Sequence, residues 1–323
     1  MKDKMIQVLI EQSSGTISRA SYDAVHCARG ISAGDSERVG LIVASDDPAP
    51  LARKLAAETG LDVTALQSAH LASSEALKQA LTTLLLERPS KYLCLPHSAA
   101  GCDLAPGLAL RLGAACITGV ESVRREGEEV FFLRPVFKGK FYEEVQTSPQ
   151  TTVLTVLPGM VKDVRFPASP GEVTVVAAAA GGPGRIRALG RVAAREDDYD
   201  LSLAEVIVAA GRGIGALENL PLVEALAALF SRSALGASRA LCDLGWLDHK
   251  HQVGITGKTV APKMYLACGI SGTAQHLAGM RGSPCIVAIN RDPGAPIFRV
   301  AHYGIVEDLT TFIPLMLELT EGE

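Results

Sequence analysis

Aromatic residues, charged residues and long apolar runs are all scarce in this sequence. Aromatic side chains make up 5% of the residues, which argues against the stacking platforms that bind single-stranded nucleic acid. Charged residues make up 20%, and the net charge of −4 lacks the basic excess of a nucleic-acid-binding face. No apolar run approaches the ~20 residues that a membrane-spanning helix needs. We therefore expect neither a nucleic-acid partner nor a membrane span.

Paired cysteine motifs are absent as well. The number of cysteines is odd and none stands in a C-x-x-C pair, so the usual ligand patterns of zinc and iron–sulfur sites are missing and no metal is expected. The pattern predicts reduced thiols, buried as small apolar side chains, in a reducing compartment. Met1–Lys4 leads straight into an apolar strand with no leader before it, which predicts a cytoplasmic, prokaryotic protein. The seven cysteines are Cys27, Cys94, Cys102, Cys116, Cys242, Cys268 and Cys285.

The sequence does have enough apolar material for more than one core. It contains 323 residues, of which 48% are hydrophobic, and domains typically hold ~100–200 residues. Short apolar runs alternate with helical periodicity in the first half, which predicts crossover connections and a parallel sheet. The predicted strands are 5–10, 39–44 and 92–95. The predicted helices are 50–58 closed by Gly60, one capped by Ser74 and stopped at Pro89, and one containing Leu104, Leu108 and Leu112 and ended by Gly113.

The pattern changes near Val120. Segments 123–132, with a hairpin tip at Arg124–Glu129, 137–145 and 152–157 predict a β-rich extension at one edge of the sheet, and 173–180 predicts one more strand. Gly181–Gly184 and the charged stretch 185–200 lack apolar periodicity. They predict the connection between two domains, 1–193 and 194–323.

The second half returns to apolar strands. These are predicted at 204–210, 264–268 and 285–290, with one helix starting at Pro221 and a final helix over 309–319. The predicted fold class is α/β, with two domains that are each a mostly parallel sheet flanked by helices.

Three short motifs in the second half imitate known sites. Gly211–Ala216 follows a strand and fits G-x-G-x-x-A, but no acid stands ~20 residues on to hold a ribose. This loop leaves open an enzyme that uses NAD or thiamine diphosphate. Gly257–Thr259 lacks the partner glycine of a P-loop, because residue 252 is Gln252. Gly269–Gly272 lacks the second glycine of a nucleophile elbow, so a Ser271/His276 hydrolase is disfavoured.

Two further loops carry small, hydroxyl or basic residues after apolar segments. Ser271–His276 opens a predicted helix whose free backbone N–H groups suit an anion, although His276 alone also fits a surface position. Gly236–Arg239 places an arginine in a small-residue run, which fits either an acidic ligand or solvent exposure. In open α/β sheets, ligands bind outside the carboxyl ends of the strands. Together with the Gly211 loop, these loops predict a long, phosphate-containing ligand.

Longer segments of distinctive sequence run through the C-terminal half, almost without gaps from Gly211 to the last helix. They are Gln252–Lys258 (QVGITGK), Pro262–Tyr265 (PKMY), Gly269–Met280 (GISGTAQHLAGM), Ile286–Pro293 (IVAINRDP), Ala295–Phe298 (APIF) and Tyr303–Val306 (YGIV). This half closely resembles the alpha subunit of the electron transfer flavoproteins. The first half resembles that family in its alternating pattern and in pieces such as Asp103–Pro106.

The resemblance implies an electron carrier and not an enzyme that transforms its own substrate. It implies a heterodimer with a beta subunit that carries AMP or a second FAD, and one FAD held by a Rossmann-like C-terminal domain. The N-terminal domain would have an adenine-nucleotide-hydrolase-like fold, bind no nucleotide and pack on the beta subunit. Flavin dehydrogenases of the acyl-CoA dehydrogenase type, as in fatty acid beta-oxidation, would donate electrons, and a quinone reductase would accept them. A subunit of an electron-bifurcating complex that uses NADH is the alternative.

The resemblance also implies a set of FAD contacts. Arg239 would lie against the flavin ring and favour its reduced forms, Thr256 would donate to flavin N5, and His276 would donate to a ring carbonyl. Ser271 would meet ribityl or phosphate oxygens, Arg212 and Ser238 the pyrophosphate, and Asn290 and Asp308 the adenosine end. The full implied set is Arg212, Ser238, Arg239, Gln252, Val253, Gly254, Ile255, Thr256, Ser271, Gly272, Thr273, Ala274, Gln275, His276, Asn290, Asp308 and Leu309.

Two residues depart from the family pattern. Ile255 stands where the family usually has Gln, so no side-chain hydrogen bond can come from that position. His302 stands where the family usually has Asp, which would change the local charge near the adenine end.

Overall fold

The fold was analysed in a computed structural model of the whole chain. The structure describes residues 4–13, 15–32, 37–68, 71, 73–137, 139–147, 151–159, 170–178 and 201–321. The chain divides into two compact units, the first made of Met1–Val136 and Lys140–Ala193 and the second of Phe137–Gly139 and Ala194–Glu323. The domain boundary predicted near residue 194 falls outside the described residues.

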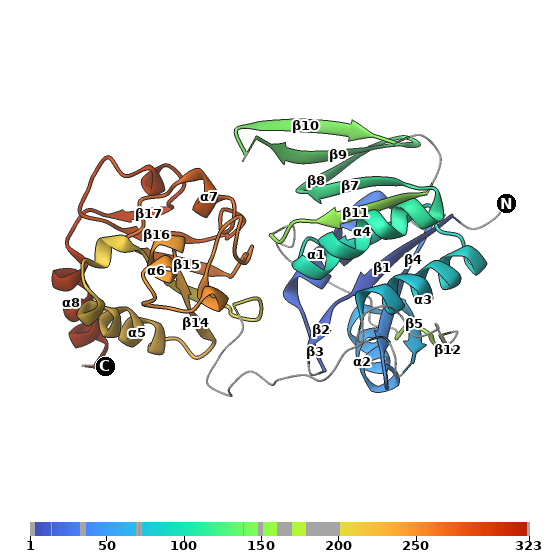
Figure 1. The fold of residues 1–323 in the computed structure, drawn as a ribbon, viewed down its shortest axis with the longest axis horizontal. Helices are drawn as coiled ribbons and strands as arrows, with labels where there is room; N and C mark the ends of the chain where they lie inside the picture. The colour runs from blue at the N-terminus through green and yellow to red at the C-terminus, as the bar shows by residue number, and fades with distance from the viewer. Residues whose placement is uncertain are drawn as a thin grey trace. The chain divides into compact units, whose positions relative to one another are not determined.

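The first unit is built on a parallel sheet (Figure 1). Its seven strands lie in the order β12-β5-β4-β1-β6-β11-β7, and every neighbouring pair is parallel. The strand in the middle, β1, pairs Ile6 with Val39 on one side and with Tyr92 on the other. The strands are β1 (Lys4–Ile10), β4 (Glu37–Ser45), β5 (Asp62–Gln67), β6 (Tyr92–Pro96), β7 (Ala115–Val120), β11 (Thr152–Val156) and β12 (Val173–Ala177). A short ribbon, β2 (Gln12–Ser13) with β3 (Thr16–Ile17), follows β1.

Helices cover both faces of this sheet. Val25 of α1 and Leu55 of α2 belong to one apolar cluster, whereas Leu81 of α3 and Leu108 of α4 belong to another. Strands buried on both faces are apolar nearly throughout, which explains why their sequences read as apolar runs. The helices are α1 (Arg19–Ile31), α2 (Ala49–Thr59), α3 (Ser74–Glu87) and α4 (Ala99–Leu112).

Serine and glycine mark the ends of these helices. Gly60 and Gly113 end α2 and α4 in the left-handed conformation, as predicted. The predicted cap Ser74 is wrong by one residue: Ser73 is the N-cap of α3, and its hydroxyl accepts from the Ala76 N–H at 3.2 Å. Ser74 therefore lies in the first turn, where its hydroxyl is available to a neighbouring helix.

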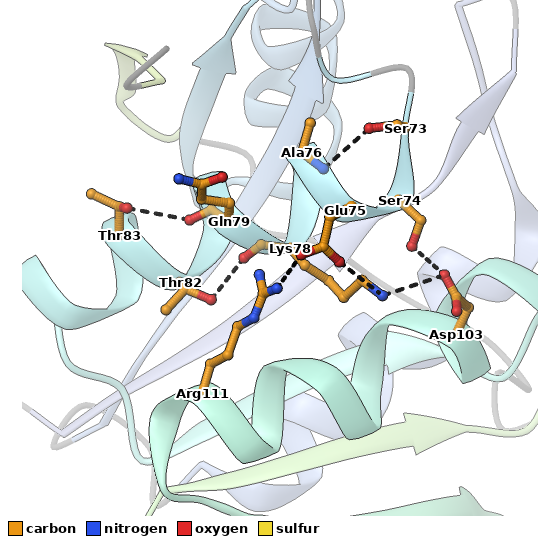
Figure 2. Close-up of polar contacts among 10 residues, drawn as sticks. All are labelled: Ser73, Ser74, Glu75, Ala76, Lys78, Gln79, Thr82, Thr83, Asp103 and Arg111. Carbon is orange, nitrogen blue, oxygen red and sulfur yellow. Dashed lines mark hydrogen bonds and ion pairs between the residues drawn. The ribbon is translucent and has the colours of Figure 1, made fainter. Parts of the chain in front are cut away.

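Polar contacts join α3 to α4 at the surface (Figure 2). Glu75 pairs with Arg111, and Ser74 donates a hydrogen bond to Asp103. Lys78 Nζ lies between Glu75 and Asp103, at 3.6 and 3.8 Å from their carboxylate oxygens. Exposed ion pairs of this kind contribute little to stability, so the apolar contacts beneath them hold the two helices to the sheet.

The predicted β-rich extension is partly correct. The strands β8 (Ser122–Glu126), β9 (Glu129–Val136) and β10 (Phe141–Gln146) form a separate antiparallel sheet, with Gly127 at a positive φ in the hairpin tip. The strand predicted at 137–145 begins only at Phe141. Segment 152–157 was assigned to the wrong sheet: its strand β11 lies inside the parallel sheet between β6 and β7. Pairing between strands distant in sequence decides this, and the local pattern does not contain it.

The second unit is a smaller parallel sheet in the order β14-β13-β15-β16-β17. Leu226 of α5 and Ile313 of α8 pack on one face, and loop residues such as Met280 and Ile297 fill the other. Its strands are β13 (Val206–Ala210), β14 (Ser233–Ala237), β15 (Met264–Cys268), β16 (Ile286–Ile289) and β17 (Tyr303–Ile305). Its helices are α5 (Leu220–Ala228), α6 (Arg239–Asp243), α7 (Ala274–Leu277) and α8 (Leu309–Glu321), and its 3-10 turns are η2 (Arg212–Ile214), η3 (Leu217–Asn219), η4 (His249–His251) and η5 (Pro296–Arg299). These two sheets confirm the predicted fold class.

All seven cysteines are free, as predicted. Their expected burial is only partly correct, because Cys116 is exposed and Cys102 and Cys285 are half-buried. Where the structure describes the chain, it contains no group of three or more His, Cys, Asp or Glu residues arranged to hold a metal ion. Its helices there are all too short or too polar to cross a membrane.

Candidate functional site

A cavity of about 810 Å³ lies in the second unit, within the usual range for a small-molecule site. Four of its wall segments come directly after strands: Arg212 follows β13, Ser238 follows β14, Gly269 follows β15 and Asn290 follows β16. These are the carboxyl ends of parallel strands, where open α/β sheets bind ligands. The sheet order brings β13 and β15 together although α5, β14, α6 and three 3-10 turns separate them in sequence.

All but three of the predicted site residues line this cavity. The exceptions are Ala274, which begins α7, Asp308 and Leu309. Leu309 is buried in the apolar core, and the Asp308 carboxylate accepts hydrogen bonds from the Thr310 N–H and hydroxyl at 2.9 and 2.7 Å. These bonds lower the pKa of Asp308 and hold it at the start of α8. In the structure, the Asp308 side chain accepts hydrogen bonds at the N-terminus of α8.

The cavity also contains residues outside the predicted set. Gly213, Gly269 and Ile270 belong to the loop motifs described above, and Arg291, Asp292 and Ala295 belong to segments that carried the family resemblance, whereas Ala240 and Asp243 belong to neither. Asp243 could have been found, because it stands one helical turn after Arg239. The others follow the predicted residues along the same loops.

Glycines let two of the cavity loops touch each other. The Gly213 N–H donates to the Gly269 carbonyl at 2.8 Å, and a Cβ on Gly213 would lie 2.7 Å from Gly269 Cα. At Gly272, φ is +84° and a Cβ would lie 2.3 Å from the Ile297 nitrogen. These glycines are therefore required by close backbone approach.

The predicted helix after Ser271 is much shorter than expected. Its helical part, α7, holds four residues and ends at Leu277, with Thr273 as an N-cap that makes no side-chain capping bond. A helix of one turn has only a small dipole. The predicted anion contact at this loop stays a prediction, and it depends mainly on the loop backbone and the arginines of the wall.

Arg239 is paired with an acid within the cavity. Its Nε lies 3.3 Å from Asp243 Oδ2, one turn further along α6, and the two side chains are 66% and 53% exposed. Beside it, Ser238 Oγ is buried and has no hydrogen-bond partner among the described residues. A buried hydroxyl without a partner is destabilising, so this atom indicates a place where a ligand's polar group would be favourable.

Gln252 orients the Thr256 hydroxyl. The Gln252 side chain is almost fully buried; its Oε1 lies 3.0 Å from His249 Nδ1 and its Nε2 donates to Thr256 Oγ1 at 2.7 Å. Because the Thr256 oxygen accepts this bond, its own proton is left to donate elsewhere. Ile255, next to Thr256, is 48% exposed and presents an apolar surface in the same wall.

Asn290 uses both ends of its amide within the chain. Its Nδ2 donates to the Ile270 carbonyl at 3.0 Å, and its Oδ1 accepts from the Asp292 N–H at 3.0 Å. This joins the loops after β15 and β16. The Asn290 side chain, which was predicted to contact adenosine, therefore positions two loops of the wall.

His302 does not line the cavity. Its Nδ1 accepts a hydrogen bond from the Ile286 N–H at the start of β16.

His276 is buried in the cavity wall and pairs with Tyr265. The Tyr265 hydroxyl lies 2.9 Å from His276 Nε2. Burial lowers the pKa of His276 to about 4, and the backbone of Val253 opposes this shift only partly. Burial also raises the pKa of Tyr265 well above its usual value. Both groups are therefore neutral near pH 7, so His276 is a neutral polar group of the wall.

The charge of the wall suits a phosphate-containing ligand. The wall contains three arginines and two carboxylates, which are Arg212, Arg239, Arg291, Asp243 and Asp292. A cavity at the carboxyl ends of a parallel sheet, with touching glycine loops and an excess of arginine, is typical of α/β domains that bind dinucleotides.

Comparison with known proteins identifies the family. Residues 200–281 match the family model of the electron transfer flavoprotein FAD-binding domain, and residues 6–181 match that of the electron transfer flavoprotein domain. The electron transfer flavoprotein subunit alpha of Bacillus subtilis is 34% identical over 98% of this chain and 97% of its own length. That of Mycobacterium leprae is 35% identical, over 98% and 96%. The chain belongs to the family of electron transfer flavoprotein alpha subunits, as its sequence segments predicted.

Another relative has a different name. The protein FixB of Clostridium saccharobutylicum is 36% identical over 76% of this chain and 74% of its own length. The family therefore includes proteins of more than one designation.

Proposed function

We propose that this chain is the FAD-binding subunit of an electron transfer flavoprotein, an electron carrier that transforms no substrate of its own. The observation that supports this proposal most is the cavity at the carboxyl ends of β13 to β16, in the unit that contains the match to the FAD-binding family model. We further propose that residues 194–323 form the FAD-binding domain and that residues 1–193 pack against a beta subunit.

The residues of the cavity fit FAD. Ser238 Oγ and His276 Nδ1 are buried polar atoms without partners among the described residues. Arg212 and Ser238 would hold the pyrophosphate, and Ser271 the ribityl or phosphate oxygens. Thr256 has a free hydroxyl proton for a ring nitrogen. When bound, FAD supplies the capacity to accept and release single electrons.

The chain's own contribution is to bind and orient the ring and to set its charge environment. Arg239 would place a positive charge beside the ring and favour its reduced forms, and Asp243 would offset part of that charge. Asn290 would keep the loops after β15 and β16 in one arrangement.

The partners follow from the family. A beta subunit that carries AMP or a second FAD would complete the heterodimer, flavin dehydrogenases of the acyl-CoA dehydrogenase type would donate electrons, and a quinone reductase would accept them. A role in fatty acid beta-oxidation and a cytoplasmic location stay predictions. A bifurcating complex that uses NADH stays the alternative. An NAD enzyme is disfavoured, because the Gly211 loop leads into the 3-10 turn η2 and not into the helix that a dinucleotide fingerprint opens.

The test is to purify the chain with its beta subunit and to count flavins. We expect a flavin absorbance spectrum and one FAD per alpha chain. Arg212→Ala should reduce the FAD retained, whereas the matched control Arg232→Ala should not, because Arg232 pairs with Glu205 at the opposite end of the strands. A complex without flavin would refute the proposal. Two flavins per heterodimer, with NADH oxidation coupled to two acceptors, would select the bifurcating alternative.

A further inference from the structure

His276, in the cavity wall, is paired with Tyr265, which lies behind it. Tyr265 is fully buried in the middle of the sheet, on β15, and His276 comes from the short helix α7 and is 6% exposed. The hydroxyl oxygen and Nε2 are 2.9 Å apart, and the two rings meet edge to face with centroids 6.1 Å apart. Only His276 of the two lines the cavity.

The hydrogen bond can run in either direction, and the surroundings decide which. If Nε2–H donated to the phenol oxygen, the phenol proton would point into an apolar core with no other acceptor among the described residues, and Nδ1 would be a bare lone pair. If the phenol donates to Nε2, its proton is satisfied and the imidazole proton sits on Nδ1. Buried polar hydrogens without acceptors are unfavourable, so the second arrangement is preferred.

The backbone of Val253 supports the same direction. The Val253 backbone favours the protonated form of the His276 ring, so a ring N–H must face that backbone. Nδ1 nevertheless makes no hydrogen bond of normal geometry within the described part of the chain. The donor is thus incompletely satisfied, next to Val253, which is itself a wall residue. A ligand carbonyl against this part of the wall is the acceptor that would complete it.

We propose that Tyr265 is a positioning residue that fixes His276 in the tautomer with its proton on Nδ1, so that the wall offers the bound ligand a neutral N–H donor. The ligand part of this inference rests on the proposed function and concerns a ring carbonyl of FAD. The tautomer itself is a property of this chain with or without the flavin. His276 then adds no net charge to the site, and the arginines of the wall are its source of positive charge.

Nitrogen NMR of the histidine rings tests the tautomer directly. The heterodimer is labelled with 15N-histidine, and the His276 signals are assigned by their loss in His276→Gln. Long-range 1H–15N spectra separate protonated from unprotonated ring nitrogens. We expect a protonated Nδ1 and an unprotonated Nε2 in the wild type. In Tyr265→Phe, which removes only the hydroxyl, a substantial population with the proton on Nε2 should appear, while Tyr303→Phe, a change at an exposed tyrosine on β17, should leave the wild-type pattern.

The outcomes separate this inference from the proposed function. A protonated Nε2 in the wild type, or an unchanged tautomer in a folded Tyr265→Phe variant, overturns the role of Tyr265. The wild-type spectrum alone decides the tautomer if Tyr265→Phe does not fold. Comparison of flavin-free and FAD-reconstituted protein then tests the ligand: the Nδ1 signal should shift on FAD binding. An unshifted signal with FAD bound refutes the contact, whereas failure to bind FAD at all refutes the proposed function and leaves the tautomer assignment standing.

Discussion

Replacing Arg239 by alanine is expected to lower the first reduction potential of the bound FAD. A unit charge about 4 Å from the ring is worth about 4 kcal/mol at an effective dielectric of about 20 and about 1 kcal/mol in water. The side chain is 66% exposed and lies 3.3 Å from the Asp243 carboxylate, so the lower half of this range applies. We expect about 1–2 kcal/mol, which corresponds to about 40–90 mV for one electron.

The pairing with Asp243 supplies a second, opposite prediction. Asp243→Asn removes the negative charge that offsets Arg239, and it should therefore raise the potential, by less than Arg239→Ala lowers it. Arg239→Lys keeps the charge but loses the planar fork that Asp243 holds, so its potential should lie between those of the wild type and Arg239→Ala.

Spectroelectrochemical titration of the purified heterodimer measures these shifts. Arg232→Ala is the matched control, since it removes the same charge from an exposed ion pair at the start of β14 and should leave the potential unchanged. An unchanged potential in Arg239→Ala, or a lowered one in Asp243→Asn, would show that the Arg239–Asp243 pair does not act on the ring as the electrostatic reasoning requires.

Three further predictions concern stability and the cavity wall. The pKa of His276 is about 4 in the folded chain against 6.5 in the unfolded chain, so the unfolded chain takes up the proton first as the pH falls. The free energy of unfolding of the second unit should therefore drop by up to about 3 kcal/mol between pH 7 and pH 4. His276→Gln should remove that part of the pH dependence, measured in urea titrations followed by the fluorescence of the single tryptophan, Trp246. At Gly272, φ is +84° and the new Cβ of Gly272→Ala would lie 2.3 Å from a backbone nitrogen. This variant should therefore retain less FAD and unfold at a lower urea concentration than the wild type. Full retention of FAD would contradict the close approach of the two loop backbones at this glycine. Arg111→Ala, which removes an exposed ion pair between α3 and α4, should leave the melting temperature of the first unit nearly unchanged in circular dichroism melts, and a clear decrease would mean that this ion pair stabilises the unit.

The sequence was sufficient for much of the local structure. Apolar runs such as Met264–Cys268 are buried on both faces of a parallel sheet, and Gly60 and Gly113 end their helices because they adopt the left-handed conformation that other residues resist. The long segments from Gln252 to Met280 were distinctive enough to indicate the family before any fold was seen.

Local patterns were insufficient wherever a helix or strand depends on distant partners. The strand β14 was not predicted, because Ser233–Ala237 is rich in small residues and becomes a strand only through its pairing with β13. The helix expected after Ser271 stops at Leu277, two residues before Gly279, where a Cβ would lie 2.4 Å from the Gly254 nitrogen of a distant loop.

By itself the sequence determined the α/β class, the strand-end loops and the family, because these follow from the period of apolar residues and from short runs of glycine, serine and arginine. Only the tertiary structure decided which loops share a wall and that a buried tyrosine on β15 contacts His276. The physical reason is that these relations arise from the order of strands in the sheet. Contacts between residues far apart in sequence set that order, and no local pattern encodes it.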